Sequence, residues 1–256
     1  MKKLTIIKIG GKLLDDESAW KKALIDFSEI KEAKILVHGG GKMASEISQK
    51  LGIKPKLIEG RRITNAASLE IATMVYAGLI NKKLVSYLQS LKQNAMGFSG
   101  ADGNLILSEK RPVKLIDFGF VGDIKKINTE LIISLLAQNI IPVFSAITHD
   151  GKGQLLNTNA DTIAATLSVH LASYFQTTLK FCFEKEGVLI NPVNEEEIFP
   201  NLSQTEYLNE TKKGVISAGM IPKLENAFTA KKAAVHQVRI CGVSGINQLK
   251  GTEICL

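Results

Sequence analysis

Short apolar runs alternate with stretches of helical periodicity along almost the whole chain. The runs are apolar nearly throughout, as buried strands are, and they cover residues 4–9, 34–38, 95–97, 140–146, 179–182 and 237–241. Between them apolar residues recur at helical spacing, as at Leu131, Leu135 and Leu136 after the capping candidate Asn128. Buried strands separated by helices imply a parallel sheet covered on both faces. The pattern therefore predicts an α/β fold.

One stretch departs from this alternation, at residues 104–125. Residues 104–107 and 118–121 flank a set of turn residues, which is the pattern of a hairpin. We expect an antiparallel pair of strands there, at one edge of the main sheet.

The length of 256 residues allows one α/β domain with two lobes or two small domains. No apolar run approaches the roughly 18 residues that a membrane span requires, and the N-terminal residues have no signal-peptide pattern. These features predict a cytoplasmic protein without a membrane partner. The cysteines Cys182, Cys241 and Cys255 match neither a disulfide framework nor a zinc site, so we expect them to be reduced and structural.

The formal net charge of +7 raises the question of a polyanionic partner. The basic residues occur at most in pairs such as Lys212-Lys213 and Lys231-Lys232, without interleaved aromatic residues. A solvated lysine-rich surface is therefore the preferred interpretation, and nucleic-acid binding is the third-ranked alternative among functions.

Glycine turns follow the first two predicted strands. Lys8 precedes Gly10 and Gly11, and the second strand ends in the sequence His-Gly-Gly-Gly at residues 38–41, ahead of a helical stretch. Such turns at the carboxyl ends of parallel strands provide backbone N–H groups for phosphate or carboxylate oxygens. The alternative is that the glycines only form tight turns. Neither a P-loop nor a dinucleotide-binding glycine motif is present.

Three further segments carry candidate binding or catalytic residues. Arg61 and Arg62 precede a predicted helix, and an arginine fork can hold a carboxylate, although one of the two is expected only to be solvated. Asp161 lies in the first turn expected after the cap Asn159, where an acidic residue is also structurally favourable. Lys223 lies at a helix start, which disfavours a cation and so calls for a functional explanation.

Five segments now occur in the order and spacing found in one known family. They are Lys8-Ile9-Gly10-Gly11, His38-Gly39-Gly40-Gly41, Gly60-Arg61-Arg62-Ile63-Thr64, Asn157-Thr158-Asn159-Ala160-Asp161 and Gly219-Met220-Ile221-Pro222-Lys223. Over essentially its whole length the chain resembles the amino acid kinase family. The resemblance implies a three-layer αβα sandwich with a mostly parallel central sheet. It also implies a single domain over residues 1–256, with an acceptor lobe at about 1–165 and a nucleotide lobe at about 166–256.

The resemblance implies a kinase that uses ATP. Lys8 and Lys223 would flank the migrating phosphoryl group, Asp161 would lie between them, and Gly10 and Gly11 would bind phosphate through backbone N–H groups. Fixed cations and N–H donors are what a protein contributes to phosphoryl transfer. Two lysines about 4 Å apart would repel by about 4 kcal/mol at an effective dielectric constant of 20, which explains a carboxylate between them.

The acceptor implied by the resemblance is N-acetyl-L-glutamate, phosphorylated on its side-chain carboxylate on the route to arginine. Gly40, Gly41, Arg62 and Asn157 would hold it. A carboxylate with a pKa of about 4.3 is ionised at neutral pH and needs no general base, so we expect His38 to be structural. Mg²⁺ is expected to arrive bound to ATP phosphates, with no protein ligand.

Two features leave alternatives open. Residues 183–187 read Phe-Glu-Lys-Glu-Gly, where most family members have a Thr-Asp pair before the glycine, so we assign no adenine or ribose contacts. The chain starts at its first predicted strand, without the extra N-terminal helix of the arginine-inhibited members, which predicts a homodimer insensitive to arginine. The nearest alternative acceptor is N-succinylglutamate or another N-acylglutamate. A non-enzymatic alternative is a sensor that binds ATP or an amino acid.

Overall fold

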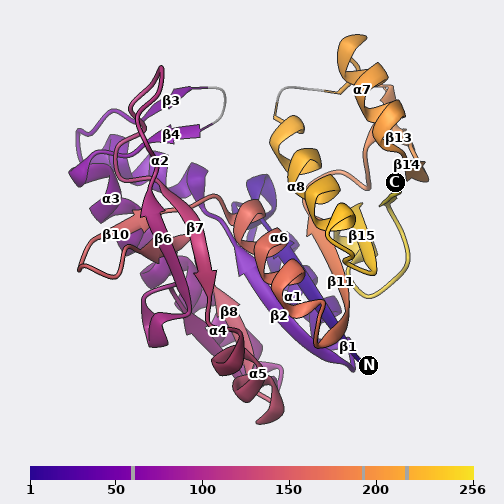
Figure 1. Cartoon of the computed structure of the whole chain (residues 1–256), viewed down its shortest axis with the longest axis horizontal. Coiled ribbons are helices and arrows are strands. Elements are labelled where there is room, and N and C mark those ends of the chain that lie inside the picture. Colours follow the sequence, from indigo (N-terminus) through magenta and orange to yellow (C-terminus); the bar gives the residue numbers. More distant parts are fainter. Residues whose placement is uncertain (59–60, 192–193, 217–218) are drawn as a thin grey trace. The chain divides into compact units, whose positions relative to one another are not determined.

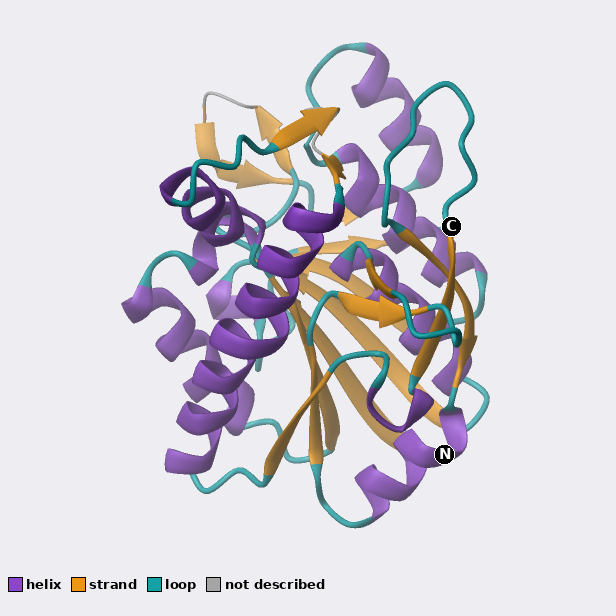
Figure 2. Ribbon diagram, turned by 90° about the vertical axis from the view of Figure 1, so that its left-hand side faces the viewer, coloured by secondary structure: helices purple, strands orange, loops and turns teal. Residues whose placement is uncertain are grey.

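The computed structural model describes residues 1–58, 61–191, 194–216 and 219–256. Contacts between Cα atoms divide the chain into two compact units (Figure 1). Unit 1 comprises residues 1–34 and 164–256, and unit 2 comprises residues 35–163. Each unit consists of strands with helices packed against them (Figure 2).

The sheet of unit 1 has five strands in the order β14-β16-β15-β11-β1. Their bounds are β1 Lys2–Ile9, β11 Phe175–Cys182, β14 Asn201–Leu202, β15 Gln237–Cys241 and β16 Thr252–Ile254. The pairs β1/β11, β11/β15 and β14/β16 are parallel, and β15/β16 is antiparallel. Residues 4–9 and 238–241 are buried, as expected for strands apolar almost throughout. A hairpin of β12 (Leu189–Asn191) and β13 (Asn194–Ile198) is separate from this sheet.

The helices of unit 1 begin where the sequence supplies capping groups. They are η1 Gly11–Leu14, α1 Glu17–Ser28, α6 Ala160–Leu171, which starts in unit 2, α7 Gln204–Lys212, α8 Ile221–Lys232 and η4 Val243–Gly245. Asp16 caps α1 by accepting from the N–H groups of Ser18 and Ala19, and Ser203 forms a capping box with Glu206 at α7. The Asn159 side chain accepts from the N–H groups of residues 161 and 162, which confirms the predicted cap of α6.

Unit 2 contains a parallel set and a separate antiparallel set of strands. The parallel set is β2 (Ala33–His38), β8 (Ile141–Phe144) and β5 (Ala95–Phe98), in the order β2-β8-β5. The second set is β10-β9-β6-β7, with bounds Leu155–Asn157, Ile147–His149, Ile106–Lys110 and Gly122–Ile127. The α/β class with mostly parallel strands is confirmed.

The predicted hairpin is partly wrong. Strands β6 and β7 are antiparallel, as expected, but they lie two to four residues after the predicted ranges and belong to the four-stranded sheet, not to an edge of the main sheet. The strand at 122–127 contains Lys125 and Lys126, which are exposed. An exposed strand face carries polar side chains and gives no apolar run, so the pattern placed the strand too early.

The helices of unit 2 are α2 Gly41–Lys50, α3 Ala66–Thr73, η2 Met74–Ile80, α4 Asn81–Ser90 and α5 Thr129–Ala137, with a short η3 at Asp102–Asn104. Asn65 and Asn128 cap α3 and α5. Helix η2 is a π-helix that continues directly from α3 and into α4. Segments of this kind occur frequently at functional sites. A hairpin of β3 (Lys56–Ile58) and β4 (Arg61–Ile63) precedes α3.

Lys180 on β11 fixes the loop that follows β15. Its side chain is buried, and its ammonium group donates to the carbonyl oxygens of Gly245, Ile246 and Gln248 at 2.9, 3.0 and 2.8 Å. Lys180→Met keeps an apolar stem but leaves these carbonyls without that donor. We expect a loss of about 2 kcal/mol in the free energy of unfolding, measured by urea denaturation. The matched change Lys213→Met, at an exposed ion pair with Glu210, should cost under about 1 kcal/mol, and equal losses would contradict the argument.

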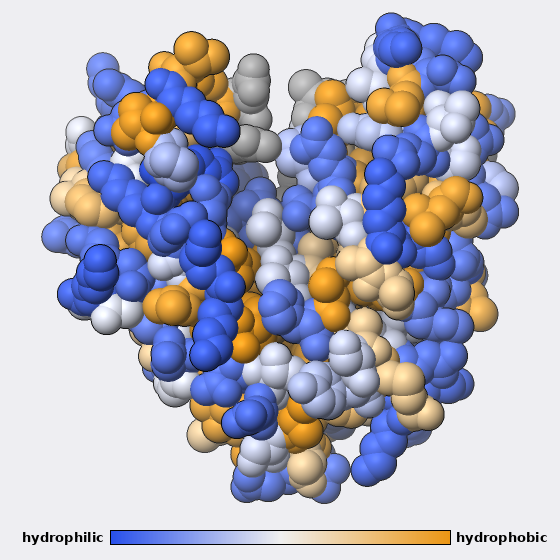
Figure 3. Space-filling model, in the orientation of Figure 1, coloured by the Kyte–Doolittle hydropathy of each residue, from blue (hydrophilic) through white to orange (hydrophobic). Residues whose placement is uncertain are grey.

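The face of the molecule in Figure 3 is mainly hydrophilic, with hydrophobic residues in small groups. In the part of the chain that the structure describes, we find no helix both long and apolar enough to span a bilayer. The three cysteines are free thiols, as predicted; Cys182 and Cys241 are buried.

Candidate functional site

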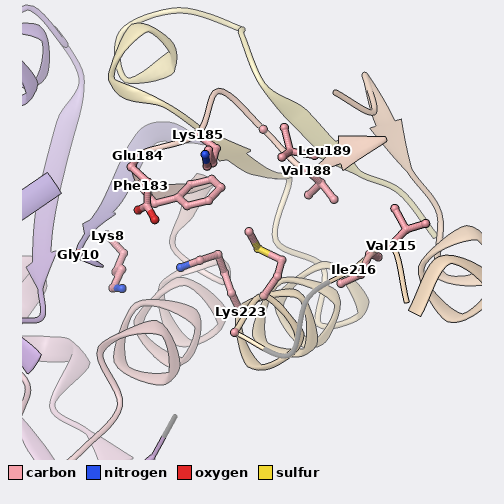
Figure 4. Close-up of a pocket in the computed structure, with 13 residues that line it drawn as sticks. Lys8, Gly10, Phe183, Glu184, Lys185, Val188, Leu189, Val215, Ile216 and Lys223 are labelled. Carbon is pink, nitrogen blue, oxygen red and sulfur yellow. The ribbon is translucent and has the colours of Figure 1, made fainter. Parts of the chain in front are cut away.

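A pocket of about 430 Å³ lies in unit 1 at the carboxyl ends of β1 and β11 (Figure 4). Its apolar wall is formed by side chains from β12, from the segment after α7 and from the approach to α8, and these are Val188, Leu189, Val215, Ile216 and Met220. Its charged lining residues are Lys8, Glu184, Lys185 and Lys223. An apolar wall with a few charged groups is the usual composition of a small-molecule site.

Lys8 reaches this pocket from the end of β1. Its side chain is buried and folds back beside Gly10, where an added Cβ would lie 2.5 Å from the Lys8 ammonium nitrogen. Glycine at position 10 is therefore required by the close approach of the lysine, independently of any turn. Gly11 follows as the first residue of η1. The predicted group of Lys8, Gly10 and Gly11 is thus continuous in the structure, with Lys8 and Gly10 lining the pocket.

Lys223 reaches the same pocket from α8, two residues after the helix starts. Its side chain is buried, with the ammonium nitrogen 5.6 Å from the ring centroids of both Phe181 and Phe183. Lys8 is the direct neighbour of Phe181 in the β1/β11 register, so the two side chains leave the sheet on the same face. The structure therefore brings both lysines, 215 positions apart in sequence, to one pocket (Figure 4).

The unusual segment after β11 lines this pocket as well. Phe183, Glu184, Lys185 and Gly187 all contribute to the lining. Glu186 turns away from it and accepts a hydrogen bond from the Ser244 hydroxyl. The segment therefore contributes both an aromatic ring and charged groups where the family pattern predicted a Thr-Asp pair.

Unit 2 holds the predicted glycine turn after β2. Gly40 has φ +154°, and a Cβ there would lie 2.3 Å from Ile80 and 3.0 Å from the Tyr76 ring. Gly41 is the first residue of α2. The turn thus presents the N-terminus of a helix behind glycines that no larger residue can replace, as an anion site requires.

Arg62 is fixed beside this turn. It is buried, and its guanidinium donates to the Gly41 carbonyl oxygen at 2.8 Å and to the Ser45 hydroxyl at 2.7 Å. Tyr76, on the π-helix, is hydrogen-bonded to Arg62. Burial raises the pKa of the Tyr76 phenol, and the neighbouring Arg62 charge opposes this, so Tyr76 remains a neutral hydroxyl at physiological pH.

Asn157 and Asp161 lie along the next predicted motif. The Asn157 amide donates to the Thr64 hydroxyl at 3.0 Å, two residues from Arg62. Asp161 is in the first turn of α6 and is assigned to unit 2, whereas both lysines are in unit 1. Gly60 of the arginine motif lies outside the described residues, as does Ala218 beside Gly219.

His38 is fully buried at the end of β2. Its Nε2 is 3.1 Å from the Asn81 amide nitrogen and its Nδ1 is 2.9 Å from the Gly39 carbonyl oxygen. A histidine with both ring nitrogens engaged in the core has a structural role, in agreement with the expectation from sequence.

Cys182 and Cys241 are neighbours at the ends of β11 and β15. Their mutual hydrogen bond and burial hold the pKa of the Cys182 thiol well above its usual value. The same hydrogen bond lowers the pKa of the Cys241 thiol. Both remain buried thiols beneath the segment that lines the pocket.

Sequence analysis did not identify Phe181, Phe183 and Tyr76. Aromatic residues in a strand or helix are normally part of the core, and Phe181 is fully buried. A signal was present for Phe183, since it begins the segment that departs from the family pattern. No comparable signal marks Tyr76.

Comparison with known proteins agrees with this geometry. The model of the family described as "Amino acid kinase family" matches residues 3–242. Acetylglutamate kinase of Parabacteroides distasonis is 48% identical over 254 residues, covering 99% of this chain and 100% of that protein. Acetylglutamate kinase of Phocaeicola vulgatus is 50% identical over 252 residues, covering 98% of each chain.

Among solved structures, the protein smu.665 from Streptococcus mutans UA159 superposes with a TM-score of 0.78 at 26% identity, over 98% of each chain. The sequence relatives and this structure match the chain from end to end, so the likeness extends over both units.

Proposed function

Since this chain belongs to the amino acid kinase family, as the resemblance of its motifs predicted, we propose that it transfers the γ-phosphoryl group of ATP to the side-chain carboxylate of N-acetyl-L-glutamate, in arginine biosynthesis. The observation that carries the proposal is the meeting of Lys8 and Lys223 in one pocket. The names of the relatives, at 48% and 50% identity, supply the acceptor.

The pocket of unit 1 is the proposed ATP site. Its apolar wall suits a nucleotide base, while the two lysines suit the phosphates. Negative charge spreads over the oxygens of the migrating group during transfer, so cations fixed before the reaction lower the barrier. We assign this role to Lys8 and Lys223, with Gly10 and Gly11 donating backbone N–H groups. Asp161 is the proposed carboxylate that keeps the two ammonium groups in place.

The acceptor is proposed to bind to unit 2. The N–H groups of Gly40 and Gly41 at the start of α2, the Arg62 guanidinium and the Asn157 amide provide donors for carboxylate and amide oxygens. The functional lobes remain a proposal, with acceptor binding within about residues 1–165 and nucleotide binding within about 166–256. By contacts, the first 34 residues group with residues 164–256, so Lys8 belongs to the nucleotide unit.

An ionised carboxylate attacks phosphorus without losing a proton, so the reaction requires no general base. Mg²⁺ is proposed to bind through the ATP phosphates, where it neutralises charge on the polyphosphate. The described residues fit this mode, because they contain no group of three or more His, Cys, Asp or Glu side chains placed to cage a metal ion.

The proposed assembly is a homodimer insensitive to arginine, acting in the cytoplasm. The family resemblance supports this, and light scattering with and without arginine tests it.

The direct test is to incubate the purified protein with ATP, Mg²⁺ and N-acetyl-L-glutamate. We expect ADP and an acyl phosphate in equal amounts, the latter trapped as a hydroxamate. N-succinylglutamate and free glutamate are the matched acceptors. A higher kcat/KM with N-succinylglutamate would reassign the acyl group, whereas ATP binding without ADP or hydroxamate would favour the sensor alternative.

A further inference from the structure

The segment that departs from the family pattern begins with a ring beside one of the two proposed catalytic lysines. Phe183 is buried, and its ring centroid is 5.6 Å from the Lys223 ammonium nitrogen. Phe181 lies at the same distance of 5.6 Å. Figure 4 shows the Phe183 ring above the Lys223 side chain at the pocket.

The two rings are held from below by the sheet. Phe181 is fully buried on β11, next to Lys8 in the register. Phe183 follows the last residue of β11, and its backbone N–H donates to the Cys241 carbonyl oxygen at 3.1 Å, which continues the pairing with β15 past the end of the strand. Phe183 therefore has a fixed backbone position.

Lys223 needs such support for two physical reasons. It lies in the first turn of α8, where the helix dipole disfavours a cation, and only 8% of it is exposed to solvent. The face of an aromatic ring attracts an ammonium ion through its quadrupole. A ring carries no net charge, so it holds the cation while leaving its full positive charge for a phosphoryl oxygen. A carboxylate would neutralise that charge.

We propose that Phe183, together with Phe181, is a positioning residue that holds the Lys223 ammonium group over the phosphoryl site through cation–π attraction. The inference rests on the proposed function for its catalytic consequence. It gives the departing segment a role, since the Thr of the family pattern offers no ring face to a lysine.

The test replaces Phe183 by phenylalanines with one, two and three ring fluorines. Fluorination weakens the negative face of the ring with little change in size, so packing is nearly preserved. We expect kcat to fall stepwise along the series and to fall about tenfold in Phe183→Leu, with a much smaller change in the KM of the acceptor. The thermal midpoint of the fluorinated proteins should stay close to that of the wild type.

The same fluorinated residues at Phe27 are the matched control. The Phe27 ring is 5.1 Å from the Lys34 ammonium nitrogen and belongs to α1, outside the pocket. The control series should leave kcat unchanged. A kcat that stays constant across the Phe183 series and in Phe183→Leu would overturn the proposal.

A second measurement separates this inference from the proposed function. The ε-methylene signals of Lys223, assigned with Lys223→Arg, should be shifted by the ring currents in wild type and should lose part of that shift in Phe183→Leu. If the wild type forms no acyl phosphate, the proposed function fails, and this shift alone decides whether the rings hold the lysine. Signals at ordinary lysine values would then overturn the inference.

Discussion

Alanine at position 8 or 223 is expected to lower kcat by at least about a hundredfold, with smaller changes in the KM of ATP and of the acceptor. Each lysine is buried in the wall of the pocket, Lys8 beside Gly10 and Lys223 at the two rings. A cation fixed in this way interacts most strongly with charge that develops during transfer. Its loss therefore raises the barrier more than it weakens substrate binding. Steady-state kinetics with both substrates varied measures the effect.

Two controls sharpen this prediction. Lys232→Ala removes an exposed lysine at the other end of the same helix as Lys223 and should leave kcat unchanged. Lys223→Arg keeps the charge but replaces a compact ammonium group by a planar fork, so we expect an intermediate kcat. A Lys223→Ala protein with normal kcat and a normal thermal midpoint would remove Lys223 from the proposed mechanism, and the same holds for Lys8.

The regular elements were predictable where burial gives a simple pattern. The strand expected at 237–241 has those bounds, and the one expected at 4–9 starts two residues earlier. The strand expected at 179–182 begins at Phe175, because Gln176, Thr177 and Thr178 interrupt the apolar run. Thr177 is buried even so, since a threonine hydroxyl can bond to backbone, here to the Phe175 carbonyl oxygen.

The site was predictable to the extent that its residues belong to motifs. The glycine turns, Arg62 and the two lysines were identified because their residue types are costly or unusual at those positions. Phe183 and Tyr76 were not, because their roles depend on which distant side chain they meet. Tyr76 also depends on the π-helix at Met74–Ile80, whose sequence has no feature that distinguishes it from an ordinary apolar helix.

Arg62→Ala is expected to raise the KM of N-acetyl-L-glutamate by about a hundredfold and to change kcat less, because a bidentate contact with the acceptor exists both before and during transfer. The guanidinium is oriented by the Gly41 carbonyl oxygen and the Ser45 hydroxyl, so it is fixed before the acceptor arrives. Initial rates at saturating ATP, with the acceptor varied, measure the effect.

Arg111→Ala is the matched control in unit 2. Arg111 forms a forked ion pair with Asp123, with nitrogen–oxygen distances of 3.0 and 2.6 Å, and makes no contact with the glycine turn in the described hydrogen-bond network. Its removal should leave the acceptor KM unchanged. Tyr76→Phe removes only the hydroxyl that bonds to Arg62 and should raise the acceptor KM by about two- to tenfold, the scale of one hydrogen bond.

The order of these three effects is the stronger test, because each variant removes a different part of the same arrangement. Loss of the fork should exceed loss of the hydroxyl that orients it, and both should exceed loss of an ion pair elsewhere. An Arg62→Ala protein that is folded, with an unchanged acceptor KM and a reduced kcat, would move Arg62 from acceptor binding to the transition state. An unchanged KM together with an unchanged kcat would remove the guanidinium from the acceptor site altogether.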